Sequence, residues 1–202
     1  MKKIILILIF IISINTFSQT MNYGLVLGIN ATDTESKNGN SLYASDAPGL
    51  DGFNVGAYFD YPINNKLGIK SYLTFNSENE TYSSSTLNEF NFDLKVNSIQ
   101  LSSVLKYHFN NEYNEGFYIL SGPRISNILS TESQASFELN DTHKNFNFGL
   151  QFGFGFKIFK FINTEFIGDY GFSDIIEDEN IKVNTFNFKL NLNFNLEHLR
   201  NK

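Results

Sequence analysis

The chain has 202 residues, a formal net charge of −6 and no cysteine, so it fits one domain and cannot form disulfides, a lipoprotein anchor or thiolate metal sites. Its hydrophobic content of 42% and mean hydropathy of −0.20 exclude a helical membrane protein. The 22 Phe and 10 Tyr are nevertheless a heavy aromatic load. Strands with one face in lipid and the other in a polar interior account for both observations.

The first residues have the pattern of a secretory signal peptide. Two lysines precede the almost wholly apolar stretch Ile4–Ile14, and Thr16–Ser18 supplies small residues at the positions that a signal peptidase reads. We therefore expect residues 1–18 to be a cleaved signal peptide and residues 19–202 to form an outer-membrane β-barrel domain. The apolar run is shorter than the roughly 20 residues of a transmembrane helix.

Alternation of apolar and polar residues predicts eight strands in the mature chain. Two stretches alternate most strictly, Phe146–Ile158 and Thr185–Leu196, and each places Phe and Leu on one face and Asn, Gly, Gln or Lys on the other. Strands of roughly ten residues with this pattern span a bilayer as a closed barrel. The predicted strands cover about 23–31, 53–61, 67–77, 97–109, 117–129, 145–159, 161–173 and 182–196.

The connections between these strands alternate between short and long. The short ones are 62–66, 110–116 and Lys160, and the long ones, rich in Ser, Asn, Asp, Glu and Gly, are about 32–52, 78–96, 130–144 and 174–181. Short periplasmic turns and longer extracellular loops alternate in this way in outer-membrane barrels. The predicted fold is an eight-stranded antiparallel up-and-down barrel with both termini in the periplasm.

One strand changes its apolar parity. Before Asn97 the apolar residues occupy even positions, and after it they occupy odd positions. Because a one-residue shift moves side chains to the other face of a sheet, we expect either a β-bulge or an extension of the strand above the membrane near Asn97–Ser98.

Aromatic residues cluster where the predicted strands meet the short turns. Rings of amphipathic aromatics are expected at the headgroup level of a membrane. The residues concerned are Tyr23, Tyr61, Tyr107, Phe109, Phe117, Phe159 and Phe161.

Several of these segments resemble a known family. Ser98–Phe109 (SIQLSSVLKYHF) followed by Phe117–Ser126 (FYILSGPRIS) is similar to an adjacent strand pair of the PorT-like outer-membrane β-barrel proteins of Bacteroidota. Gly24–Thr32, Phe152–Phe156 and Tyr170–Ile175 resemble the first, sixth and seventh strands of that family. The resemblance implies an outer-membrane location and an eight-stranded barrel, and it implies little about activity.

Eight charged or amide side chains are predicted to face the interior of the barrel. They are Asp60, Lys70, Gln100, Lys106, Arg124, Glu165, Asp169 and Lys189. An eight-stranded barrel is wide enough only for its own side chains or one small ligand, and opposite charges in that space should pair. We expect a polar plug that makes the barrel rigid, with a narrow solute path, kept open by inward glycines, as the alternative.

The long connections are acidic, and Glu177–Glu179 is their densest cluster. Negative charge makes nucleic acid an unexpected partner, since phosphate binding needs the opposite sign. No EF-hand spacing is present, so no metal site or cofactor is predicted, and cation-mediated contact with lipopolysaccharide is a hypothesis. The three histidines, His108, His143 and His198, show no triad spacing, so we expect interfacial or solvated side chains and no enzyme.

The sequence therefore predicts an outer-membrane barrel with a structural or surface-interaction role, a closed polar lumen and acidic extracellular loops. Its expected partners are outer-membrane lipid and lipopolysaccharide. One alternative is an accessory membrane subunit of a secretion or envelope machine, with envelope or secretion proteins as partners. The other alternative is a narrow small-solute channel.

Overall fold

A computed structural model describes residues 21–36, 52–84, 90–133, 145–172 and 183–197. The predicted signal peptide lies outside these residues, as do most of the predicted long loops. Within the described part of the chain, no helix is long and apolar enough to cross a membrane.

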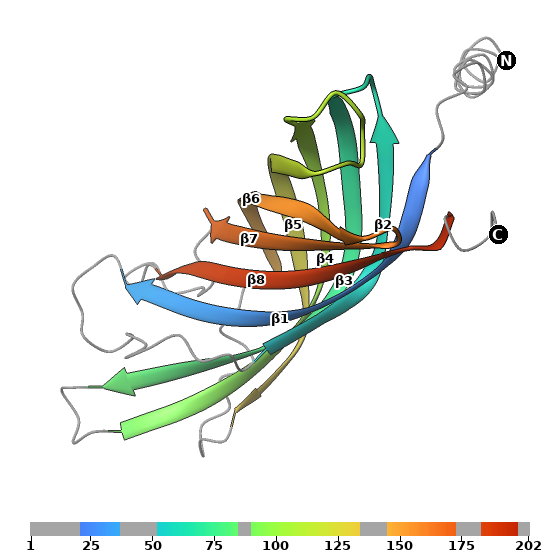
Figure 1. Ribbon diagram of the computed structural model, residues 1–202. Helices are drawn as coiled ribbons and strands as arrows, with labels where there is room; N and C mark the ends of the chain where they lie inside the picture. Colours follow the sequence, from blue (N-terminus) through green and yellow to red (C-terminus); the bar gives the residue numbers. More distant parts are fainter. Residues whose placement is uncertain (1–20, 37–51, 85–89, 134–144, 173–182, 198–202) are drawn as a thin grey trace, which may run out of the picture.

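Eight antiparallel strands form a closed barrel in which every strand pairs with its neighbours in sequence and β1 pairs with β8 (Figure 1). This arrangement confirms the predicted fold. The strands are β1 Asn22–Ser36, β2 Gly52–Pro62, β3 Leu67–Ser84, β4 Phe90–His108, β5 Phe117–Ser133, β6 Phe146–Phe159, β7 Ile162–Gly171 and β8 Val183–Asn195.

The alternation in sequence becomes an alternation between two surfaces. Along β6, Phe148, Phe152 and Phe154 are each more than 40% exposed, whereas Asn147 and Gln151 are no more than 5% exposed. Because successive strand side chains point to opposite faces, the closed sheet has an apolar outer surface and a polar interior, the lumen.

Three short turns lie at one end of the barrel, which we call the turn end. They span residues 63–66, 109–116 and 160–161. In the first, the Asn64 side chain accepts hydrogen bonds from the backbone N–H groups of Lys66 and Leu67, both at 2.9 Å. In the second, Asn114 and Gly116 adopt positive φ values of 65° and 70°. β1 begins and β8 ends at this same end, since Gly24 pairs with Asn195.

The aromatic residues predicted to surround the turn end lie there on the outer surface. Six of them are between 36% and 61% exposed, namely Tyr23, Tyr107, Phe109, Phe117, Phe159 and Phe161. Tyr107 and Phe109 pack edge to face, with ring centroids 5.4 Å apart.

The opposite end, which we call the loop end, carries a long β3–β4 hairpin. The prediction of a loop over residues 78–96 is wrong, because β3 continues to Ser84 and β4 starts at Phe90 (Figure 1, green). The two strands stay in register out to the Ser84–Phe90 pair, while β2 stops pairing with β3 at Ser77. Mostly polar residues, Glu78–Ser84, hid the extension of β3, because outside a membrane neither face of a strand needs to be apolar.

Near Asn97 the structure shows both a strand extension and a bulge. β4 does extend past Asn97 as far as Phe90, as one of the two alternatives predicted. In addition, Asn97 pairs with Ser130 and Ser98 with Ile128, so Leu129 on β5 is an extra residue. The bulge therefore lies on the neighbouring strand. β4 itself keeps its alternation, since Val96, Ser98 and Gln100 all remain buried.

Candidate functional site in the barrel lumen

A buried carboxylate on β7 organises the turn end of the lumen. Lys70 Nζ lies 2.6 Å from Glu165 Oε1, and the Tyr118 hydroxyl donates to the same oxygen at 2.8 Å. The Tyr72 hydroxyl donates to the other carboxylate oxygen at 2.9 Å. Lys70 and Glu165 are both 0% exposed. Because β3, β5 and β7 are not neighbours in the sheet, these contacts cross the interior of the barrel.

A second ion pair draws the β4–β5 turn into the barrel. Lys106 Nζ lies 2.7 Å from Asp60 Oδ2 and also donates to Asn114 Oδ1 at 2.9 Å. The Tyr113 hydroxyl donates to the other oxygen of Asp60. Burial, and then the negative charge of Asp60, raise the pKa of Tyr113, so its phenol stays protonated and remains a donor. Tyr113 and Asn114 thus cap the turn end.

His108 belongs to this cap. The prediction of an interfacial or solvated histidine is wrong, because His108 is 0% exposed and faces inward at the end of β4. Its ring centroid lies 4.6 Å from that of Tyr113 and 4.9 Å from that of Tyr118. Two tyrosines therefore enclose the imidazole.

The two buried lysines at the turn end also face aromatic rings. Lys70 Nζ lies 4.2 Å from the ring centroid of Tyr58 and 4.9 Å from that of Tyr72. Lys106 Nζ lies 4.3 Å from the Tyr118 centroid. Each ammonium consequently has a carboxylate partner and cation–π contacts in a space without water access.

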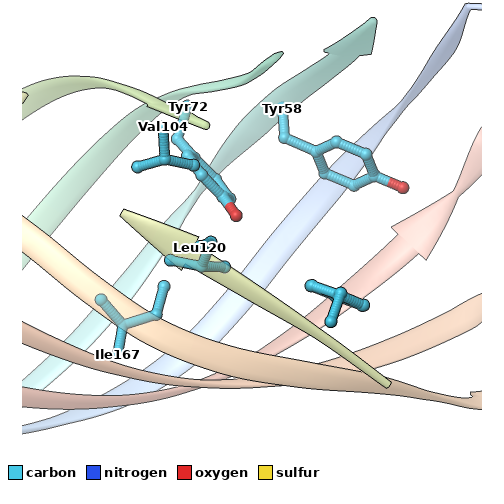
Figure 2. Close-up of a cluster of buried hydrophobic side chains, with 6 residues drawn as sticks. Tyr58, Tyr72, Val104, Leu120 and Ile167 are labelled. Carbon is cyan, nitrogen blue, oxygen red and sulfur yellow. The ribbon is translucent and has the colours of Figure 1, made fainter. Parts of the chain in front are cut away.

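An apolar layer separates this cluster from the loop end. Val104, Leu120 and Ile167 point into the lumen from β4, β5 and β7 and are at most 3% exposed (Figure 2). Tyr58 and Tyr72 lie beside them in the same cluster (Figure 2). On β4 and β7 the inward residues run from polar to apolar to polar, for example Asp169, Ile167 and Glu165 on β7.

The loop-end cluster is built around Asp169. Arg124 Nε lies 2.6 Å from Asp169 Oδ1, and Lys189 Nζ lies 3.2 Å from Oδ2. Gln100 and Gln151 donate to Oδ2 at 2.7 and 3.0 Å. Lys189 also donates to Gln100 Oε1 at 2.6 Å. One carboxylate thus holds together side chains from β4, β5, β6 and β8.

The structure places all eight predicted lumen residues inside the barrel, each at most 6% exposed. They divide equally between the clusters. Asp60, Lys70, Lys106 and Glu165 lie at the turn end, and Gln100, Arg124, Asp169 and Lys189 lie at the loop end.

The sequence interpretation missed the inward tyrosines and placed Glu78 in an outer loop. Glu78 instead lies on β3 and accepts hydrogen bonds within the lumen from Asn30 and Asn187 at 3.3 and 3.4 Å. The inward position of Tyr72 and Tyr118 could have been read from their even numbers, which they share with Lys70 and Arg124 on the same strands. Their role in binding Glu165 had no sequence signal.

Inward glycines provide room for large side chains. A Cβ on Gly155 would lie 2.5 Å from the Tyr118 ring, and a Cβ on Gly149 would lie 2.6 Å from Arg124 Nε. A Cβ on Gly68 would collide with Tyr113. At these three positions the side chains of Tyr118, Arg124 and Tyr113 occupy the space that the channel alternative requires to be open.

A small cavity of about 40 Å³ lies at the loop-end cluster. Charged, hydroxyl and apolar side chains line it, among them Glu78, Arg124, Lys189, Ser98, Thr185 and Val96. Such a volume holds only a few water-sized groups.

A closed eight-stranded barrel with an apolar exterior and a paired ionic interior is the architecture of an outer-membrane β-barrel protein. The family described as outer membrane protein beta-barrel domain matches residues 17–177, and the chain belongs to this family. The predicted outer-membrane location is thereby confirmed. A comparison with curated proteins found no match.

Solved structures of small outer-membrane barrels are similar to the chain. Neisserial surface protein A is 12% identical with a TM-score of 0.53, over 87% of this chain and 99% of that one. Ail of Yersinia pestis, in complex with the heparin analogue sucrose octasulfate, is 12% identical with a TM-score of 0.49, over 88% and 99%. OprG of Pseudomonas aeruginosa is 13% identical with a TM-score of 0.42, over 87% and 91%. At these identities, the likeness to Neisserial surface protein A supports the fold alone.

Proposed function

We propose that the protein is a closed outer-membrane barrel with a structural or surface-interaction role and without catalytic or transport activity. The filled lumen is the observation that carries this proposal. Lys70, Lys106 and Glu165 are 0% exposed, and the apolar layer adjoins them. A hydrated solute would have to displace paired charges and an apolar layer together, which is costly in a space of low dielectric constant.

The proposed contact surface is the loop end, whose acidic sequence segments lie largely outside the described residues. Its partners would be lipopolysaccharide, bridged by divalent cations, or proteins at the cell surface. Protease digestion of the loops with and without calcium tests the cation bridge. Slower cleavage in calcium supports it, and equal rates in both conditions contradict it.

This role requires the turn end to face the periplasm. Since the chain has no cysteine, labelling of a single introduced cysteine shows on which side of the membrane that position lies. A membrane-impermeant maleimide should label Glu132→Cys on intact cells, and should label Asn65→Cys only after the outer membrane is broken. The reverse pattern would contradict the proposed orientation.

The second candidate is an accessory subunit of a secretion or envelope machine, which the PorT-like resemblance favours. Affinity capture of the tagged protein from outer membranes in mild detergent separates the two functions. Recovery of the barrel alone, folded and heat-modifiable on a gel, supports a self-contained surface barrel. Stoichiometric secretion or periplasmic components would instead support the subunit role.

A further inference from the structure

The loop-end cavity contains a carboxylate without a cationic partner. Glu78 lines the cavity and accepts two long hydrogen bonds, from the amides of Asn30 and Asn187. Among the described residues it forms no ion pair, because the two cations that line the same cavity, Arg124 and Lys189, both pair with Asp169. A partly buried carboxylate with weak amide donors gains most from a charge-assisted hydrogen bond to a cation.

The same cavity contains donors without acceptors. Arg124 uses Nε for Asp169 and Nη1 for Asn147, while its Nη2 makes no hydrogen bond to any described residue. The hydroxyls of Ser98 and Thr185 also line the cavity without a partner in the described chain. All three side chains are more than nine-tenths buried, with exposed fractions of 6% to 7%. Unused donors at such depth are suited to an anionic group.

The charges of the cavity balance, which restricts the ligand. Arg124 and Lys189 are offset by Asp169 and Glu78. A ligand of net charge would disturb this balance, whereas a zwitterion adds an ammonium at Glu78 and a carboxylate at Arg124 without changing it. The volume of about 40 Å³ admits only a small molecule, and the apolar layer ends the lumen on one side.

We propose that this cavity is a binding site for a small zwitterion of the size of glycine or alanine, which enters from the loop end. Glu78 accepts hydrogen bonds from the ammonium. Arg124 Nη2 and the hydroxyls of Ser98 and Thr185 donate to the carboxylate. The site is independent of any partner at the cell surface and needs no passage through the barrel.

Isothermal titration of the full mature barrel in detergent with glycine and with alanine tests the proposal. We expect saturable binding, at least tenfold weaker in Glu78→Gln and several-fold weaker in the double variant Ser98→Ala/Thr185→Val. The matched control Glu115→Gln, which changes an exposed carboxylate at the other end of the barrel, should bind as the unmodified protein does. Heat-modifiable migration on a gel shows that each variant is folded, and the hydroxyl variant is the test if Glu78→Gln does not fold.

Compounds with a single charge complete the experiment. Ethylamine offers only the ammonium and propionate only the carboxylate, so each should bind at least tenfold more weakly than alanine. The proposal fails if neither amino acid binds, if Glu78→Gln binds them unchanged, or if either single-charge compound binds as tightly as alanine.

Discussion

Each buried charge at the turn end has an opposite charge and a ring beside it. Glu165 pairs with Lys70 and accepts hydrogen bonds from two tyrosine hydroxyls. Lys106 pairs with Asp60 and lies over the ring of Tyr118. The attraction between two such ions offsets the cost of taking them from water only while both are present. The lumen is therefore sensitive to the loss of one partner.

Replacing Glu165 by Gln should leave the Lys70 ammonium buried and unpaired. We expect this variant to lose about 3–5 kcal/mol of stability. The measurement is urea unfolding in lipid vesicles, followed by heat-modifiable migration on a gel. As the control, Glu115→Gln removes the ion pair between Glu115 and Lys157, whose side chains are 49% and 23% exposed. This exposed pair should contribute less than about 1 kcal/mol to stability. Equal losses in the two variants would contradict the role assigned to Glu165.

A second prediction concerns the ring that covers Gly155. Gly155→Ala should cost about 1–3 kcal/mol, because the new methyl group forces the Tyr118 ring to move. In a Tyr118→Leu background the same change should cost less, since the obstructing ring is absent. A double-mutant cycle of unfolding free energies measures this coupling. Additive losses would show that Tyr118 does not restrict position 155.

At the scale of the element, the sequence predicted strands well within the membrane and poorly beyond it. The strict alternation of Phe and Asn located β6 and β8, because lipid on one side and the lumen on the other impose a period of two. Outside the bilayer that constraint ends, so the ends of β3 and β4 looked like loops. The sequence predicted a bulge near Asn97 only as one alternative and did not show which strand carries it, since the extra residue, Leu129, lies on β5 while β4 keeps its alternation.

For the candidate site, the sequence predicted which residues line the lumen but not which of them form pairs. Alternation placed charged residues such as Lys70 and Asp169 in the lumen, but it could not pair them. Pairing depends on which inward positions of distant strands lie at the same height, as Lys70 on β3 and Glu165 on β7 do. The pairing also depends on the β4–β5 turn, from which Tyr113 enters the barrel to bind Asp60. The sequence of a turn has no alternation of apolar and polar residues, so the inward direction of Tyr113 could not be predicted.

The outer part of the β3–β4 hairpin should be dispensable for the barrel. Glu80 and Leu94 are paired, so an Asn-Gly turn can replace residues 81–93 and close a shorter hairpin. Because β2 pairs with β3 only as far as Ser77, we expect the shortened protein to fold and its unfolding midpoint to stay within a few degrees. Thermal unfolding by circular dichroism measures this. A failure to assemble into membranes would show that the hairpin takes part in folding.

At the scale of the whole molecule, the barrel has three layers inside and one continuous apolar surface outside. The two ionic clusters hold non-neighbouring strands together, and Val104, Leu120 and Ile167 separate them. An eight-stranded barrel has little space left once its own side chains fill it. The cavity at Glu78 lies on the loop-end side of the apolar layer.

Conductance across a planar lipid bilayer tests the closed lumen most directly. Purified mature protein, inserted and folded, should give no unitary conductance steps at moderate voltage. A triple variant that removes the apolar layer, Val104→Gly/Leu120→Gly/Ile167→Gly, shows whether the assay detects a widened lumen. Stable steps of uniform size from the unmodified protein would contradict the closed barrel and favour a solute channel.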